Sequence, residues 1–226
     1  MDWPDPRADR MRDPVPVEER SAPALVRVLV NGGPSSWQRA GFDCSKAGFR
    51  AGEVEVLVGG HSKVPLLVFE PDCGPLDGTA VPGNGSEVGE LPAVHPNGVC
   101  GVDHVVVSTG GVERTSGLLA DAGLELLGDR QAVLGGKQVE QRFHHAGPCL
   151  IELVGPSGAT GGDPARVWGI TFVTSEIESL PALEPAPVAS IRDAVQPGRR
   201  IATAVPEVGL PTRVAFMDPR TRKTPK

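Results

Sequence analysis

The order of predicted elements is the feature that most constrains this chain: a short strand, a helix and then further strands, repeated along the sequence. This order occurs twice clearly and a third time weakly, within residues 24–71, 100–156 and 168–219. One such unit is too small to bury a face of its own sheet, so the units are expected to pair. The sequence therefore predicts an α+β protein built from repeated βαβββ modules.

Hydrophobic periodicity places the main elements. VDHVVVS (102–108) and CLIELVGP (149–156) are apolar runs of strand length, and VERTSGLLADAG (112–123) has helical spacing and stops at a glycine. WGITFVT (168–174) and TRVAFMDP (212–219) give the first and last strands of the third unit. A short helical stretch between them is expected to end at a proline, because proline breaks a helix interior.

Glycine (29 residues) and proline (23 residues) are frequent throughout, which argues against long helices and marks the linkers between units. The Pro- and Asp-rich start, with no apolar period, predicts a disordered tail. The predicted organisation is a disordered tail (1–22), a degenerate N-terminal βαβββ-like module (23–71), a linker (72–99), one module (100–156), a second linker (157–167), a second module (168–219) and a basic tail (220–226).

Charge and composition exclude several functions. A formal net charge of -6 argues against a broad nucleic-acid surface, and the small aromatic content offers few rings for stacking bases. The sequence contains no window of about 18 apolar residues, so no membrane span is predicted. The first residues also lack the apolar region of a secretory signal. We therefore expect a cytoplasmic protein whose four cysteines are free thiols, with no nucleic-acid or membrane partner.

Within residues 100–219, five segments follow one another in an informative order: GVDHVVVSTGGVERTSGLLADAGLEL, CLIELVGP, WGITFVTSEIESL, QPGRRIAT and VAFMDP. With these segments the chain resembles the vicinal oxygen chelate superfamily, the glyoxalase/bleomycin-resistance/dioxygenase-like proteins. It looks most like bacterial glyoxalase-like proteins. The resemblance implies that two βαβββ modules pair into a curved eight-stranded mixed sheet that cups a site, and residues 23–71 look like a weaker extra module of the same kind.

The resemblance also implies a pattern of metal ligands, in which each module gives one ligand from its first strand and one carboxylate from its last strand. The first module keeps both positions, with His104 in VDHVVV and Glu152 in LIELV, but the second has Gly169 and Ala215 there. Neither of the latter can coordinate a metal through a side chain. A complete four-ligand site within one chain is therefore not expected.

Strand alternation groups His104 with Val102 and Val106 on one face, and a Glu152 carboxylate among apolar neighbours needs a compensating partner. In RFHHAG, alternation sends His144 and His145 to opposite faces. His145 could therefore join His104 and Glu152 in a two-His-one-carboxylate site for Fe, Zn, Mn or Ni. The alternatives are a plain Glu–His or Glu–Arg pair without metal, with one of the two histidines exposed and the other bound to a backbone carbonyl.

Three further residues are candidates for substrate binding. Arg199 and Arg200 enter a strand after the Pro-Gly turn of QPGRR, so one guanidinium faces inward. An inward arginine is suited to grip a carboxylate or phosphate, although a salt bridge to Glu152 or to an outer carboxylate is an equal alternative. Trp168 could form the aromatic wall of a pocket or pack in the core.

The sequence leaves competing functions open. One is a glyoxalase-like lyase, isomerase or dioxygenase, with Glu152 and His104 as catalytic residues and Glu152 as general base or metal ligand. The second is a metal-free protein that sequesters a small molecule, as antibiotic-binding members of this superfamily do. A scaffold that lost its site is the third. All but the scaffold imply a small-molecule partner, and pairing of modules within one chain or across a homodimer stays open.

Overall fold

The computed structural model describes residues 21–60, 62–83 and 88–220, so most of both predicted tails and His61 lie outside the described residues. The N-terminal unit consists of β1 (Ala24–Asn31), α1 (Pro34–Arg39), β2 (Gly48–Ala51), β3 (Val54–Gly60) and β4 (Leu66–Glu70), followed by the 3-10 helix η1 (Leu76–Gly78). The first module contains β5 (Val99–Ser108), α2 (Val112–Asp121), β6 (Leu126–Leu134), β7 (Lys137–Ala146) and β8 (Cys149–Pro156). The second contains β9 (Arg166–Thr174), η2 (Ile177–Ala182), β10 (Val188–Asp193), β11 (Arg200–Ala204), η3 (Pro206–Val208) and β12 (Arg213–Met217).

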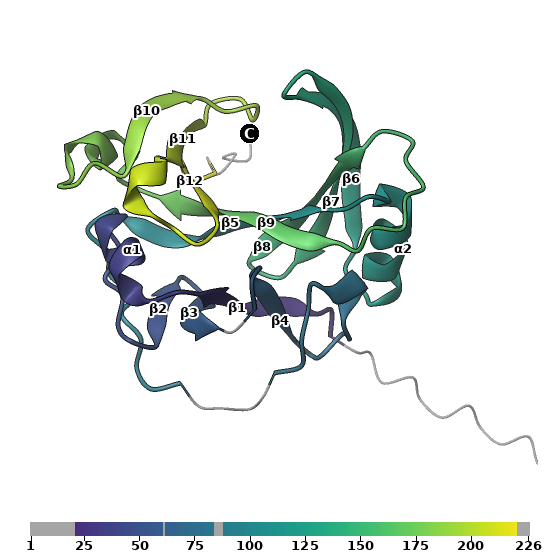
Figure 1. Ribbon diagram of the computed structural model, residues 1–226, viewed down its shortest axis with the longest axis horizontal. Helices are drawn as coiled ribbons and strands as arrows, with labels where there is room; N and C mark the ends of the chain where they lie inside the picture. The colour runs from purple at the N-terminus through teal and green to yellow at the C-terminus, as the bar shows by residue number, and fades with distance from the viewer. Residues whose placement is uncertain (1–20, 61, 84–87, 221–226) are drawn as a thin grey trace, which may run out of the picture.

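The two modules form one eight-stranded sheet with the order β10-β11-β12-β9-β5-β8-β7-β6. In each module the first and last strands are parallel neighbours, β5 with β8 and β9 with β12, and the modules join where β5 runs antiparallel to β9. The β6–β7 and β10–β11 ends of the sheet rise on two sides of its concave face (Figure 1). The predicted fold class, paired βαβββ modules in a curved mixed sheet, is confirmed.

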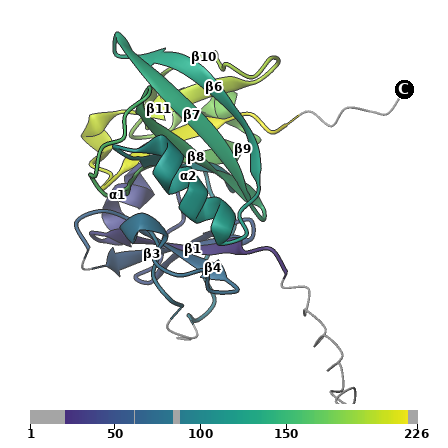
Figure 2. The same cartoon turned by 90° about the vertical axis from the view of Figure 1, so that its right-hand side faces the viewer.

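Helices contribute little to this fold. In the first module α2 packs on β7 and β8 (Figure 2) and ends before Gly123, which has a φ of +92° and so accepts the left-handed turn that stops the helix. The second module has only the 3-10 helix η2, which contains Pro181. Strand β10 was not predicted, because the prolines before it obscured the pattern. Among the described residues, no helix is long and apolar enough to cross a membrane.

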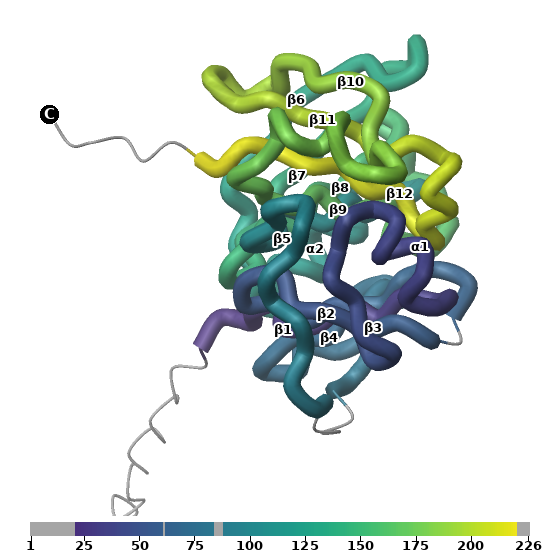
Figure 3. The backbone as a smooth tube through the Cα atoms, turned by 90° about the vertical axis from the view of Figure 1, so that its left-hand side faces the viewer, coloured from purple at the N-terminus to yellow at the C-terminus, as the bar shows by residue number. Residues whose placement is uncertain are grey.

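The N-terminal unit forms a separate four-stranded sheet with the order β2-β3-β1-β4. Its elements follow the βαβββ order, but the strands are arranged differently from the two modules. Here the third strand, β3, is the parallel neighbour of β1, and β4 pairs antiparallel with the other edge of β1. This sheet lies against the convex face of the larger sheet, away from the β6–β7 and β10–β11 ends (Figures 1 and 3).

An aromatic cluster joins the two sheets. Trp37, Phe42 and Phe49 come from the N-terminal unit, and Phe172 and Phe216 come from strands of the second module. All five side chains are buried, with no more than 2% of their surface exposed. The N-terminal unit thereby covers the face of the second module that no α-helix covers. The concave face of the larger sheet stays open.

The segment between the N-terminal unit and the first module is held by specific contacts. Asp77 accepts hydrogen bonds from the Thr115 hydroxyl at 2.8 Å and from the Ala165 amide at 3.1 Å, and it forms an ion pair with Arg114. These contacts tie the segment to α2 and to the start of β9.

Candidate functional site

A cavity of about 650 Å³ occupies the concave face of the eight-stranded sheet, and we call it the sheet cavity. Its polar floor comes from four strands, with His104 on β5, Gln141 on β7, Glu152 on β8 and Thr171 on β9. Its walls are mostly apolar and include the side chains of Val106, Val154, Ile201 and Met217. An apolar cavity with a few convergent polar groups is the usual form of a small-molecule site.

A β-bulge in β5 shapes this floor. The β5–β9 pairing passes from Val102 with Phe172 directly to His104 with Thr171, so Asp103 is an extra residue without a partner. A bulge redirects the side chains around it, and the Asp103 carboxylate lies 2.8 Å from Nδ1 of its neighbour His104. The bulge also places Val102 in the core, so the predicted grouping with His104 holds for Val106 alone.

Asp103 is a buried carboxylate held in its ionised form. Burial alone raises its pKa, but hydrogen bonds from His104 and Arg199 outweigh that effect and hold the pKa well below its usual value. Arg199 Nη2 lies 2.6 Å from Asp103 Oδ1, and both side chains are about 5% exposed or less. Because the carboxylate accepts a hydrogen bond at Nδ1 of His104, it fixes the orientation of the ring and directs Nε2 toward the cavity.

His104 Nε2 lies among hydrogen-bonding groups of the floor. It is 3.0 Å from Thr171 Oγ1 and 3.4 Å from Glu152 Oε2. Glu152 also accepts a hydrogen bond from the Gln141 amide, whose oxygen in turn accepts one from Arg130 Nε at 2.6 Å. The floor is thus a connected polar network in which His104 Nε2 and the Glu152 carboxylate face each other.

The donor set does not fit a complete metal centre. The strand registers of the two modules correspond, because His104 pairs with Leu150 as Gly169 pairs with Arg213, and Val106 pairs with Glu152 as Thr171 pairs with Ala215. At the positions equivalent to His104 and Glu152, the second module has Gly169 and Ala215, which offer no side-chain ligand. A catalytic zinc site, for comparison, uses about three protein ligands, and the described residues contain no group of three His, Cys, Asp or Glu placed to hold a metal ion.

His145 is not brought to the other two candidate ligands. It pairs with Leu150 on β8, which in turn pairs with His104, so a whole strand separates the two histidines, and its side chain is exposed. His144 is fully buried on the opposite face, where Nδ1 donates to the Leu124 carbonyl at 2.8 Å and Nε2 accepts from Ser116 Oγ at 2.9 Å. This arrangement matches the alternative in which one of the two histidines is exposed and the other bonds a backbone carbonyl.

Arg199 and Arg200 lie outside the lining of the sheet cavity. Arg199 points into the protein and bonds the Asp103 carboxylate and the Asp218 carbonyl, the latter at 2.7 Å, rather than Glu152. Arg200 pairs with Glu178 and with Asp218. Both guanidinium groups therefore have protein partners, and the binding site proposed below does not include them.

Trp168 occupies a second bulge. Pairing passes from Val106 with Gly169 to Val107 with Val167, which leaves Trp168 as the extra residue of β9. Its side chain is 46% exposed and lines the sheet cavity instead of packing in the core. The guanidinium carbon of Arg213 lies 4.8 Å from its ring centroid.

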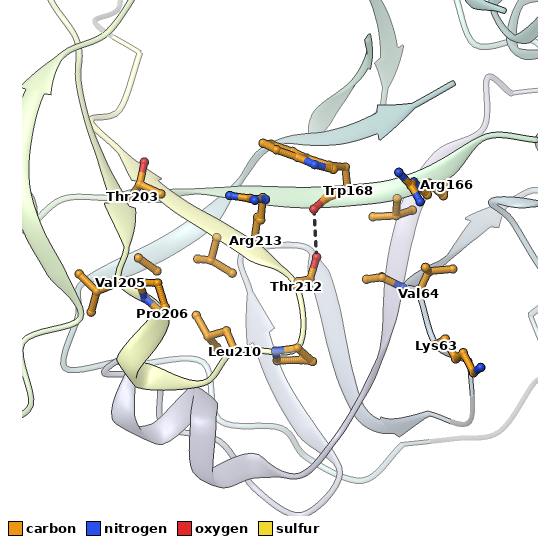
Figure 4. Close-up of a pocket in the computed structure, with 15 residues that line it drawn as sticks. Lys63, Val64, Arg166, Trp168, Thr203, Val205, Pro206, Leu210, Thr212 and Arg213 are labelled. Carbon is orange, nitrogen blue, oxygen red and sulfur yellow. Dashed lines mark hydrogen bonds between the residues drawn. The ribbon is translucent and has the colours of Figure 1, made fainter. Parts of the chain in front are cut away.

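Trp168 and Arg213 also border a second cavity of about 490 Å³, the side cavity, which lies between the segment before β4 and strands β9, β11 and β12 (Figure 4). Figure 4 shows Arg213 beside Trp168, and the Thr212 hydroxyl donating to the Trp168 carbonyl at 3.4 Å. The two cavities share four lining residues, Trp168, Thr203, Arg213 and Val214, so they are neighbours.

Sequence reasoning missed two members of the floor, Gln141 and Thr171, and it missed Asp103, which bonds His104 behind the floor. The adjacency of Asp103 and His104 was the available signal for Asp103, but strict alternation places neighbours on opposite faces. The other two are identified only by the pairing of β7 with β8 and of β9 with β5.

Comparisons with known proteins give structural similarity alone. No protein-family model matches the sequence, and no curated protein matches it. Among solved structures, methylmalonyl-CoA epimerase from Mycobacterium tuberculosis is similar over 56% of this chain and 92% of its own, with 13% identity and a TM-score of 0.44. Hypothetical protein BH1468 from Bacillus halodurans C-125 is similar over 55% of this chain and 97% of its own, with 16% identity and a TM-score of 0.43.

Proposed function

We propose that this protein binds a small carbonyl compound in the sheet cavity and moves a proton next to that carbonyl, with Glu152 as the base. The observation that carries the proposal is the buried Asp103–His104–Glu152 array at the floor of a cavity whose walls are mostly apolar. All three side chains are buried, whereas other carboxylates of this protein face solvent. Buried charges are costly unless they are paired, so the burial of these three groups together calls for a functional reason.

The step uses groups of this chain only. Glu152 removes the proton from the carbon beside the carbonyl, so a C–H bond breaks, an O–H bond forms on Glu152, and the electron pair moves to the carbonyl oxygen. His104 Nε2 and the Thr171 hydroxyl, 3.0 Å apart, can hydrogen-bond that developing oxyanion. Return of the proton to the same face of the carbon regenerates the substrate. A proton from solvent delivered to the opposite face gives the epimer, and Glu152 then releases its own proton to solvent.

Asp103 contributes to this step indirectly, through its hydrogen bond with His104. The Asp103 carboxylate at Nδ1 holds the His104 ring so that Nε2 faces the oxyanion, and the ion pair with Arg199 keeps the carboxylate in place. Gln141, held by Arg130, fixes the direction of the Glu152 carboxylate.

A second candidate is sequestration of a small molecule without chemistry. The observation in its favour is the mostly apolar wall above the floor, which can hold a hydrophobic ligand with no reaction. In that case Glu152 and His104 serve as hydrogen-bonding partners of the ligand.

The test is hydrogen–deuterium exchange in D2O, followed by NMR, with a panel of ketones, 2-oxo acids and thioesters. The wild type is expected to catalyse exchange beside the carbonyl of at least one compound, and Glu152→Gln, which keeps the shape but not the base, is expected to lose about 100-fold or more. The matched control is Glu140→Gln, since Glu140 pairs with Arg142 and does not line the cavity.

Thermal unfolding with the same panel separates the two candidates. A ligand at about 100 times its Kd stabilises by about 2.7 kcal/mol, which raises Tm by about 5–10 °C for a chain of this size. Stabilisation without exchange would favour sequestration. Neither exchange nor stabilisation by any compound would contradict both.

A further inference from the structure

The cavities are lined by positive charge although the chain as a whole is acidic. The formal net charge is -6, yet the charged side chains that line the side cavity are Lys63, Arg166 and Arg213, with no carboxylate among them. Four cations line the sheet cavity, against two carboxylates: Arg130, Lys137, Arg192 and Arg213 against Glu152 and Asp193. Such a local excess of one sign favours a ligand of the opposite sign.

The arginines that form ion pairs with carboxylates differ from those that line the cavities. Seven arginines within the described residues form ion pairs with carboxylates, and none of the seven lines either cavity: Arg27, Arg50, Arg114, Arg142, Arg199, Arg200 and Arg220. By contrast, Arg166, Arg192 and Arg213 line cavities and make no ion pair within the described chain. These three cavity-lining arginines therefore have no carboxylate partner within the described residues.

Arg213 is the best placed of these cations. It stacks on the ring of Trp168, which the bulge in β9 brings to the edge of the sheet cavity. Stacking uses the flat face of the guanidinium and limits its motion, while the N–H groups along its edge stay available for a second partner. An arginine held in this way is suited to grip an oxyanion through two parallel hydrogen bonds.

Gly169 makes room for this arrangement. A Cβ atom at position 169 would lie 3.0 Å from the Arg213 carbonyl oxygen and 3.2 Å from its Cβ atom. A side chain at position 169 would therefore crowd the backbone and the Cβ atom of Arg213.

We propose that the natural ligand is an acidic small molecule whose carboxylate or phosphoryl group binds the guanidinium edge of Arg213, where the two cavities meet, while its apolar part lies in the sheet cavity. The proposal rests on the proposed function only in that the sheet cavity binds a small molecule. Arg166 and Arg192 strengthen the attraction from the two sides.

A pair of fluorescent probes tests the charge requirement. 8-Anilinonaphthalene-1-sulfonate carries an oxyanion, and N-phenyl-1-naphthylamine has the same aromatic body without it. We expect the wild type to bind the anionic probe at least about tenfold more tightly than the neutral one, and Arg213→Gln to remove about tenfold of that affinity while leaving the neutral probe unchanged. Arg213→Lys keeps the charge without the planar fork and is expected to recover only part of the loss.

Two controls make the result specific. Arg142→Gln changes the net charge equally but lies outside both cavities, so it should bind both probes as the wild type does. Val154→Trp fills the sheet cavity and should abolish binding of both probes. If the wild type binds both probes equally, or if Arg213→Gln binds the anionic probe normally, the proposal is overturned while the sheet cavity remains a binding site. If Val154→Trp still binds both probes, the sheet cavity is not the site and the proposed function fails instead.

Competition with octanoate, octyl phosphate and octanol then separates the two acid classes. The more effective acid identifies the group that the Arg213 edge prefers. Octanol should compete most weakly, and equal competition by all three would again overturn the proposal.

Discussion

Asp103 is the residue on which the floor of the sheet cavity depends. Its buried carboxylate contacts both His104 and Arg199, and the Arg199 guanidinium is only 5% exposed. A buried ion pair adds little net stability when both members are present, but removing one member leaves the other buried and uncompensated. Asp103 is thus needed chiefly to compensate the buried charge of Arg199 and to hold the ring of His104.

Asp103→Asn should therefore lower the free energy of unfolding by about 3–5 kcal/mol, because Arg199 keeps its charge without a carboxylate partner. Urea denaturation followed by circular dichroism measures this change. Asp121→Asn, at an exposed position near the end of α2, is the control and should change stability by less than about 0.5 kcal/mol. Equal stability of Asp103→Asn and the wild type would mean that the pair is not buried as described.

His144 makes stability depend on pH. Burial, the largest effect, lowers its pKa below 6.5, so the folded protein favours the neutral ring that accepts from Ser116. Between the folded and unfolded pKa values the unfolded chain binds more protons, so stability rises with pH through that window. The contribution is complete above about pH 6.5 and is lost as the pH falls below it.

The urea midpoint measured from about pH 5 to about pH 8 should show this loss on the acid side, and His144→Asn should flatten the profile. The exposed neighbour supplies the control, since His145→Asn should keep the profile of the wild type. A profile that His144→Asn leaves unchanged would assign the pH dependence to other groups.

At the scale of elements, α2 approaches β8 closely at Gly155. A Cβ atom there would lie 2.4 Å from the Thr109 carbonyl oxygen and 2.7 Å from Val112 Cγ2, at the start of the helix. The backbone of Gly155 is extended, so crowding alone, and not a left-handed conformation, requires glycine. The first module can pack its helix against its last strand only while this position lacks a side chain.

Gly155→Ala should therefore destabilise by about 1–3 kcal/mol, because the added methyl group forces the helix and strand apart. Gly128→Ala is the matched control on β6, where a Cβ atom meets nothing within 4 Å, and it should stabilise by about 0.4–1 kcal/mol by restricting the unfolded chain. Thermal unfolding of both variants decides the comparison. Equal Tm values would show that α2 does not pack at this distance.

At the scale of the whole molecule, the N-terminal unit and the two modules share one core. The aromatic cluster takes Trp37, Phe42 and Phe49 from the N-terminal unit and Phe172 and Phe216 from the second module. Neither surface could remain apolar and exposed alone, since large exposed apolar patches promote association. The two sheets are therefore expected to unfold together.

Urea unfolding of the Trp3→Phe, Trp168→Phe double variant tests this expectation, because its fluorescence comes from Trp37 alone. The Trp37 midpoint, which reports on the N-terminal unit, should coincide with the far-UV circular dichroism midpoint, which reports mainly on the larger sheet. An earlier Trp37 transition would show that the N-terminal unit unfolds independently.

The sequence by itself determined the fold class and most of the elements, although not β10. Hydrophobic periodicity of about two residues places VDHVVVS and CLIELVGP in strands, and the glycine after the helical spacing of residues 112–123 ends α2. These signals are local, because they depend on the pattern of one segment and not on its partners. The positions of His104 and Glu152 on the first and last strands of one module were predictable for the same reason.

Only the tertiary structure decided how those strands pair and which side chains meet. The bulges at Asp103 and Trp168 each insert one residue that alternation cannot anticipate, because a bulge depends on the register with β9 or β5. They bring Asp103 to His104 and Trp168 to Arg213, two contacts that strict strand alternation does not predict. The position of the N-terminal sheet on the convex face was likewise undetermined, since an apolar strand face specifies that it will be buried but not what will cover it.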